Sequence, residues 1–203
     1  AVALAPAFVL IAWNHHQDLL GRQADLNQAA RRIAHSRAYE FGEKIEDTKG
    51  LLAIVAGFPT VKSDPSTARC GEILADMKRA LPIYVNLGVV LPDGNLACSA
   101  ESFDRKQPPN FADREWFRRA LAAGGFSVGG YVVGRLTGKH IFLFAQPVID
   151  ENGRGTSLAY ASLDLAWLSR HVANIPLPAD AALLVLDNQG RILARHPDHD
   201  EWV

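Results

Sequence analysis

An arginine and two large aromatic residues lie close together in the stretch FADREWFRRALAAGG, residues 111–125. A guanidinium group can bind a carboxylate through two parallel hydrogen bonds, and an indole ring offers an apolar wall with one polar tip. We therefore predict that Arg114 and Trp116 contact a small ligand, while Phe117 packs into the core. The alternative is that both aromatic residues anchor the segment in the core and that Arg114 pairs with an acidic side chain.

Glycine residues punctuate the strand candidate that follows, FSVGGYVVG (126–134). Glycine weakens a strand, so it is retained where a ligand or another backbone must approach closely. A glycine-rich strand beside an arginine-bearing helix favours the ligand pocket.

The sequence lacks the common catalytic motifs. The segment GRLTGKH contains a Gly-Lys pair like that of a phosphate-binding loop. Such a loop would require a glycine at position 133 and a serine or threonine at position 140, where this chain has Val133 and His140. The segment HPDHD (196–200) holds histidine and aspartate residues that could bind a metal, but such residues in loops are mostly solvated. We expect no catalytic residue, no metal site and no cofactor.

Charge and composition are those of an ordinary globular protein. The 203 residues include 21 Lys and Arg and 22 Asp and Glu, for a net charge of −1. Without a basic field there is no attraction for phosphate backbones, so we expect no nucleic-acid partner.

The first residues, AVALAPAFVLIAW (1–13), carry no charge and end at Trp13, a residue typical of the membrane interface. The run is shorter than the roughly 20 apolar residues that span a bilayer, so we interpret residues 1–13 as the C-terminal part of a transmembrane helix. The alternative is the end of a cleaved signal peptide. Both interpretations place the rest of the chain outside the cytoplasm.

Residues 14–58 contain no proline and predict one long stalk helix. Such a helix would rise about 65 Å, more than a compact domain of this size needs. Along this helix, seven positions recur in alternating steps of four and three residues and form an apolar seam. Such a seam favours a homodimer with parallel stalks. The seam consists of Ala34, Ala38, Phe41, Ile45, Thr48, Leu52 and Val55.

The chain has two cysteines, Cys70 and Cys98. In an oxidising compartment they could form one disulfide between a helix and a strand. The alternative is two separate buried thiols.

After the stalk, the pattern predicts an α+β module over residues 59–175 with one antiparallel five-stranded sheet. Its hairpins are marked by turn sequences such as PDGN and DENGRG. After a linker, LLVLDNQGRILAR (183–195) repeats the strand–turn–strand design of GVVLPDGNLACS (88–99). Residues 176–203 are therefore interpreted as the start of a second, truncated module.

The order of these pieces resembles the double-Cache (dCache or PDC) sensor domains of bacterial receptors, which are built from PAS-like modules. The resemblance is carried by NLGVVLPDGNLACSA, DREWFRRAL, GGYVVGRLTGKHIFLFAQPVID and AYASLDLAWLS. It implies a membrane-distal PAS-like module (59–175) and the start of a membrane-proximal one (176–203).

In the amino-acid-binding branch of that family, the distal pocket carries an Arg-x-Trp-Tyr signature, a later Tyr-x-Asp and a final aspartate. Arg114, Trp116, Tyr131 and Asp164 match these positions and are the implied ligand-binding residues. The arginine is implied to hold the ligand carboxylate and Asp164 its ammonium group.

Three positions depart from the signature. Phe117 replaces a tyrosine, Val133 replaces the aspartate, and Pro109 stands where a tyrosine is expected. The missing acid puts α-amino-acid recognition in doubt and favours a small carboxylate or another compact metabolite.

The resemblance therefore implies the periplasmic sensor region of a receptor in the bacterial inner membrane, with a sensor histidine kinase as the first interpretation. A diguanylate cyclase or a chemoreceptor with the same input module is the alternative. A membrane-anchored periplasmic enzyme using Asp164, His140 or the HPDHD loop is a second alternative.

Overall fold

The computed structural model describes residues 4–178 and 181–197, and the chain divides into two compact units, residues 1–45 and 46–203. Helix α1 (Leu4–Gly57) makes up the first unit and continues into the second. It confirms the predicted long N-terminal helix. Among the described residues, no helix carries an apolar stretch long enough to cross a membrane. Residues 1–3 of the predicted membrane segment lie outside the described residues.

The second unit contains the predicted five-stranded sheet, and every neighbouring pair of strands is antiparallel. The strand order is β2-β1-β5-β4-β3, so the two longest strands lie side by side within the sheet. The strands are β1 (Tyr84–Val90), β2 (Leu96–Ser99), β3 (Ser127–Val133), β4 (His140–Ile149) and β5 (Gly155–Asp164). The α+β fold class is therefore confirmed.

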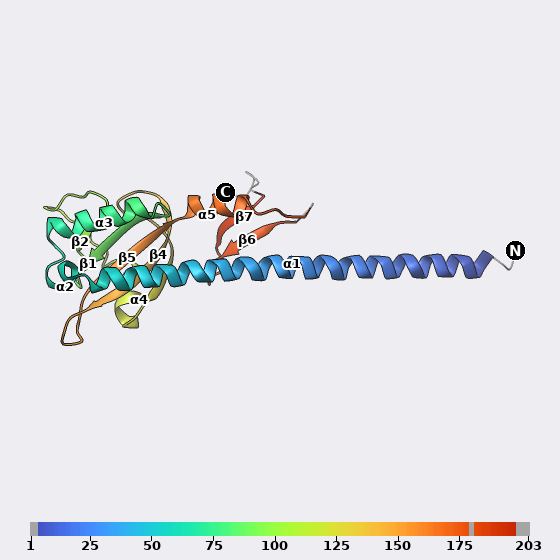
Figure 1. Cartoon of the computed structure of the whole chain (residues 1–203), viewed down its shortest axis with the longest axis horizontal. Helices are drawn as coiled ribbons and strands as arrows, with labels where there is room; N and C mark the ends of the chain where they lie inside the picture. The colour runs from blue at the N-terminus through green and yellow to red at the C-terminus, as the bar shows by residue number, and fades with distance from the viewer. Residues whose placement is uncertain (1–3, 179–180, 198–203) are drawn as a thin grey trace. The chain divides into compact units, whose positions relative to one another are not determined.

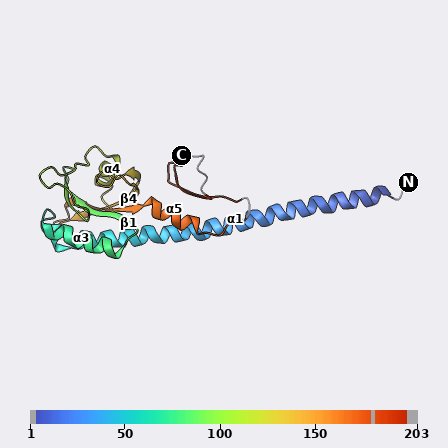
Figure 2. The same ribbon diagram turned by 90° about the horizontal axis from the view of Figure 1, so that it is seen from above.

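Helices cover both faces of this sheet. Figures 1 and 2 show α3 (Ala68–Ala80) on one face and α4 (Glu115–Ala123) on the other. Two further helices, α2 (Pro59–Ser63) and α5 (Leu165–Ala173), follow α1 and β5 directly. The sheet is thus buried on two sides, which explains why β1 has no exposed residue.

The last part of α1 packs on the sheet through the predicted seam. Leu52 and Val55 are buried, and the hydroxyl groups of Thr48 and Tyr84 lie 2.8 Å apart in a hydrogen bond. Earlier seam positions such as Ala38 are exposed. The apolar seam is therefore used for intramolecular packing from residue 48 onward.

A disulfide between Cys70 and Cys98 joins α3 to β2 across 28 positions of sequence. Both residues are buried. The bond holds α3 against the edge of the sheet that carries β1 and β2.

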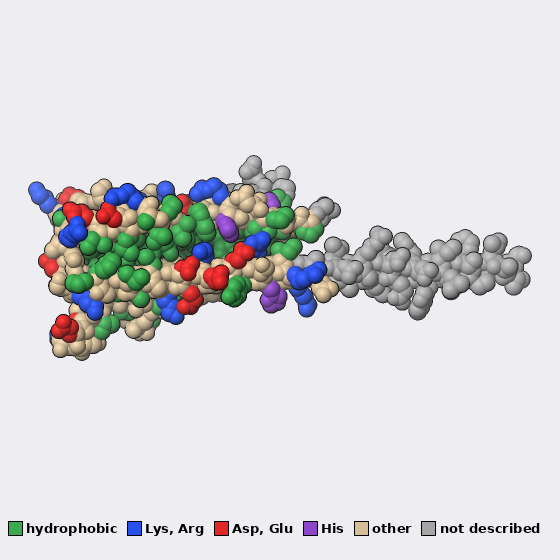
Figure 3. Space-filling view, viewed as in Figure 1, with side chains coloured by type: hydrophobic (Ala, Val, Ile, Leu, Met, Phe, Trp, Pro, Cys, Tyr) green, Lys and Arg blue, Asp and Glu red, His purple; other side chains and the backbone are tan. Residues whose placement is uncertain are grey.

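Strands β6 (Leu183–Leu186) and β7 (Ile192–His196) form a separate two-stranded sheet that contacts α5. Large hydrophobic side chains remain exposed on it, including Leu186 and Ile192, each at 52%. Elsewhere on this unit, hydrophobic side chains gather in the middle of the face drawn in Figure 3, between charged rims.

Candidate ligand-binding site

A cavity of about 30 Å³ lies between α4 and the sheet. Trp116 and Phe111 form one wall, while Ile141 and Leu143 of β4 form part of the opposite wall. The two aromatic rings are tilted against each other with their centroids 5.8 Å apart. Helix α4 can approach the sheet because β3 carries Gly129, where a Cβ atom would lie 3.0 Å from that of Trp116. The close approach explains Gly129, whereas Gly130 is explained by its φ of 81°, a backbone conformation that favours glycine.

Arg114 stands at the entrance of the cavity, at the position that precedes the first turn of α4. Its backbone N–H donates to the Phe111 carbonyl over 2.9 Å, which turns the chain into the helix. The side chain is partly buried. Within the described part of the chain, its guanidinium group makes no hydrogen bond or ion pair. A hydrogen bond from Arg135 and, to a lesser extent, the positive charge of Arg114 lower the pKa of the neighbouring Asp113, whose carboxylate is ion-paired with Arg135. The Arg114 guanidinium is therefore open to a ligand carboxylate.

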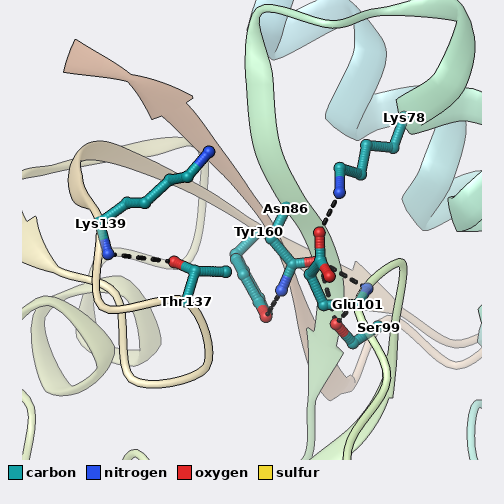
Figure 4. A network of polar contacts seen from close by, with 7 residues as sticks. All are labelled: Lys78, Asn86, Ser99, Glu101, Thr137, Lys139 and Tyr160. Atoms are coloured by element: carbon teal, nitrogen blue, oxygen red, sulfur yellow. Dashed lines mark hydrogen bonds and ion pairs between the residues drawn. The ribbon is translucent and has the colours of Figure 1, made fainter. Parts of the chain in front are cut away.

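The floor of the cavity is a buried polar network, shown in Figure 4. Asn86 Nδ2 donates to the Tyr160 hydroxyl over 2.9 Å, and Ser99 Oγ donates to Asn86 Oδ1 over 3.0 Å. The backbone N–H of Glu101 also donates to Asn86 Oδ1, and the Glu101 carboxylate pairs with Lys78 of α3. Each polar group thus has a protein partner, as buried polar groups require.

Tyr160 stays neutral at the floor of the cavity. Burial of the phenol raises its pKa well above the ordinary value, and the nearby Glu101 carboxylate raises it further, while a hydrogen bond with Ser99 opposes the shift. The hydroxyl is therefore a neutral hydrogen-bonding group at any physiological pH.

The turn between β3 and β4 covers the mouth of the cavity, which Leu136 and Thr137 line. Arg135 holds the turn in place: it pairs with Asp113 over 2.7 Å, donates to the Asn110 carbonyl and lies 5.5 Å from the Phe111 ring centroid. This hydrogen bond from Arg135 lowers the pKa of Asp113 below its ordinary value. Figure 4 shows Thr137 pointing from the turn toward Tyr160.

The four implied ligand-binding residues do not all meet at this cavity. Arg114 and Trp116 line it. Tyr131 instead lines a neighbouring cleft of about 190 Å³, together with Arg114 and Trp116, and its hydroxyl lies 2.6 Å from His140 Nδ1. Asp164 lines neither cavity: it precedes α5, and its Oδ1 accepts a hydrogen bond from the Ala166 N–H over 2.8 Å.

The three departures from the family signature have different structural consequences. Phe117 is 2% exposed in the core, as predicted. Val133 lines the cavity at its rim and is 43% exposed. Pro109 lies outside the cavity lining, and its carbonyl accepts a hydrogen bond from Leu96 N–H.

Sequence reasoning missed the floor of the cavity. Asn86, Tyr160 and Ser162 line it from two neighbouring strands, β1 and β5. The available signal was a polar residue inside an otherwise apolar strand, since Asn86 interrupts YVNLGVV.

The HPDHD segment lies largely outside the described residues, which stop at residue 197. Within the described ranges, no group of three or more histidine, cysteine or acidic residues could hold a metal ion.

The family model of the Cache domain, dCache_1, matches residues 22–202. No curated protein matches the sequence. Among solved structures, the extracellular domain of rpHK1S-Z16, assigned as a histidine kinase, is similar with a TM-score of 0.72 and 19% identity; the match covers 82% of this chain and 69% of that one.

Two further structures show the same fold. The ligand-binding domain of the Pseudomonas fluorescens chemoreceptor CtaA, in complex with L-serine, is 17% identical with a TM-score of 0.68, covering 87% of this chain and 74% of that one. The sensor domain of the V. cholerae histidine kinase DctB is 16% identical with a TM-score of 0.67, and the match covers 85% of this chain and 67% of that one. Because the family model spans most of its length, the chain belongs to the Cache-domain family, as its sequence motifs predicted.

Proposed function

We propose that this chain is the periplasmic input domain of a receptor in the bacterial inner membrane, and that it binds a small metabolite carboxylate in the cavity beside Arg114. The observation that carries the proposal is the partly buried Arg114 guanidinium at the cavity entrance, which has no protein partner among the described residues. A carboxylate would supply two parallel hydrogen bonds to such a group.

Membership of the Cache family makes the chain a sensor domain of a membrane receptor, not a catalytic one. We propose a sensor histidine kinase as the parent protein, because rpHK1S-Z16 and DctB share the fold. A chemoreceptor is the second candidate, favoured by the likeness to CtaA. A diguanylate cyclase is an alternative that rests on the sequence resemblance alone.

The domain boundaries predicted from the sequence belong to the same proposal. Residues 1–13 would end a transmembrane helix, residues 14–58 would form the stalk, residues 59–175 the ligand-binding module and residues 176–203 the start of a membrane-proximal module. The end of α1 at Gly57 supports the proposed end of the stalk, and the sheet formed by residues 84–164 lies within the proposed ligand-binding module.

A homodimer through the stalk completes the proposal. Ala34 and Ala38 continue the apolar seam of α1 but are exposed, and nearby Tyr39 is 71% exposed. Small apolar residues at helical spacing allow two helices to approach each other closely. A ligand would shift such a dimer between two states only by its difference in affinity for them.

The test is a thermal-shift screen of the purified chain with small carboxylates, amino acids and amines. A ligand at about 100 times its Kd stabilises the folded state by about 2.7 kcal/mol, so a binding carboxylate raises the melting temperature in a saturable way. Arg114→Gln should abolish this rise. The matched control is Arg118→Gln on the same helix, because Arg118 is exposed and does not line the cavity.

A stabilising carboxylate whose effect is unchanged in Arg114→Gln would refute the proposed site. Circular dichroism of each unliganded variant shows whether the variant is folded. If Arg114→Gln unfolds, Arg114→Lys keeps the charge but loses the planar fork, and weaker carboxylate binding is then expected.

A further inference from the structure

We infer that the cavity beside Arg114 selects a short monocarboxylate with an uncharged, apolar end, and that it rejects amino acids and dicarboxylates of the same size. The inference rests on the proposed function and specifies its ligand class. It depends on three properties of the cavity: its size, the charges on its lining and the protein partners of those charges.

The size of the cavity favours a short ligand. Its volume is about 30 Å³. The neighbouring cleft that Tyr131 lines is about 190 Å³, so this cavity is the smaller of the two spaces beside Arg114. A short carboxylate is therefore the ligand expected here, and a longer one would require the β3–β4 turn to move.

The charges on the lining favour a ligand with a single negative charge. No aspartate or glutamate is among the described residues that line the cavity. The polar groups of the floor, Asn86, Tyr160 and Ser162, are all neutral. An ammonium group inside this cavity would lose its water without gaining a carboxylate partner, which is costly for a charged group.

A second carboxylate on the ligand would also lack a partner. The other arginine on the lining, Arg135, already pairs with Asp113 over 2.7 Å and donates to the Asn110 carbonyl. Binding a second carboxylate through Arg135 would break this pair and detach the turn from the segment before α4. Arg114 is therefore the one lining cation without a protein partner in the described part of the chain.

The remaining lining suits a short alkyl group. Val132, Leu136, Ile141 and Leu143 line the cavity around the aromatic wall, and Ile141 and Leu143 are each 3% exposed. Burying one methylene or methyl group against such a surface contributes about 0.8 kcal/mol. The apolar end of the ligand would thus lie against β4 while its carboxylate faces Arg114.

Four small probes separate the possibilities. Propionate has a carboxylate and a methyl end, glycine replaces the methyl with an ammonium group, and malonate replaces it with a second carboxylate. Propylamine has an amine and no carboxylate. Binding of each to the purified chain is measured by thermal shift and by calorimetric titration at constant ionic strength, because salt screens exposed charges.

We expect propionate to bind, and glycine and malonate to bind at least about tenfold more weakly, since each places an unpartnered charge in the cavity. Propylamine should not bind. Arg114→Gln should abolish the propionate signal, and Arg118→Gln should preserve it.

Two other outcomes overturn the inference in distinguishable ways. Glycine or malonate binding as tightly as propionate, in a manner lost with Arg114→Gln, would refute the monocarboxylate specificity and leave the proposed sensor site intact. If no carboxylate, from these probes or the wider screen, binds in an Arg114-dependent manner, both the inference and the proposed site are wrong.

Discussion

The floor and the mouth of the cavity differ in whether their polar side chains have protein partners. At the floor, Asn86, Ser99 and Tyr160 are at most 7% exposed and are joined to one another by hydrogen bonds. At the mouth, Arg114 and Val133 are partly exposed, and the guanidinium of Arg114 has no partner among the described residues. The difference indicates that the floor serves the fold, because its polar groups are satisfied by the protein itself. The mouth leaves one charged group without an ion-pair partner, and this is where we propose that the ligand binds.

This comparison predicts two classes of variant. Changes behind or within the floor should lower the free energy of unfolding, because they disturb buried, fully packed groups. Changes at the mouth should alter ligand binding and leave stability nearly unchanged.

The largest expected effect is removal of the disulfide behind the floor. The double variant Cys70→Ala/Cys98→Ala releases α3 from β2 and opens a loop of 28 positions. A loop of that length should cost about 3–4 kcal/mol of unfolding free energy. Urea denaturation measures the loss, and a reducing agent should destabilise the wild-type chain but not the double variant. A loss below about 1 kcal/mol would show that the bond does not support the floor.

A second, smaller loss is expected for Gly88→Ala on β1. The added Cβ atom would lie 2.4 Å from Cε1 of Tyr160, whose ring is buried and whose hydroxyl is held by Asn86. Overpacking of this kind costs about 1–3 kcal/mol. The matched control is Gly155→Ala on β5, where no atom lies within 4 Å of the new Cβ. Equal stability of the two variants in urea would contradict a rigid floor.

The floor also shows where sequence reasoning stops. The five strands were predictable because each hairpin turn is a local signal. The chemistry and spacing of Arg114 and Trp116 singled them out, and the structure places both at one cavity, while their contact with a ligand stays a prediction. Asn86 and Tyr160 meet although they lie 74 positions apart. Their contact depends on β1 pairing with β5, and no local pattern specifies that strand order.

Asp164 illustrates a different limit. The family signature implies that it meets the ligand, and the structure shows its carboxylate accepting a hydrogen bond from Ala166 N–H at the start of α5. An aspartate at this position is a common helix N-cap. A motif match identifies only the type of residue, and an aspartate at this position can equally well serve as the N-cap of a helix.

At the mouth, Val133→Asp should change specificity more than stability. Val133 is 43% exposed at the cavity rim, so an aspartate there can remain solvated, and the loss of strand propensity is at most about 1 kcal/mol. The new carboxylate would compete with a carboxylate ligand for Arg114 and would offer a partner to an ammonium group. Propionate binding should therefore weaken about tenfold or more while glycine binding appears. Unchanged preference for propionate would show that the missing acid does not set the specificity.

The smallest effect is expected for Asp113→Asn, which removes the acidic partner of Arg135 at the mouth. Surface ion pairs contribute little to global stability, so the melting temperature should stay nearly constant, as in the control Glu115→Gln, whose acid pairs with Arg119 instead. The local effect should depend on pH. Because its hydrogen bond with Arg135 holds the pKa of Asp113 below the ordinary value of 3.8, the pair contributes above that value and is lost as the pH falls through the lowered pKa. Amide hydrogen exchange of residues 134–139 should therefore be faster in Asp113→Asn at neutral pH. The variant and the wild type should converge in acid, and equal exchange at neutral pH would show that Arg135 does not hold the turn through Asp113.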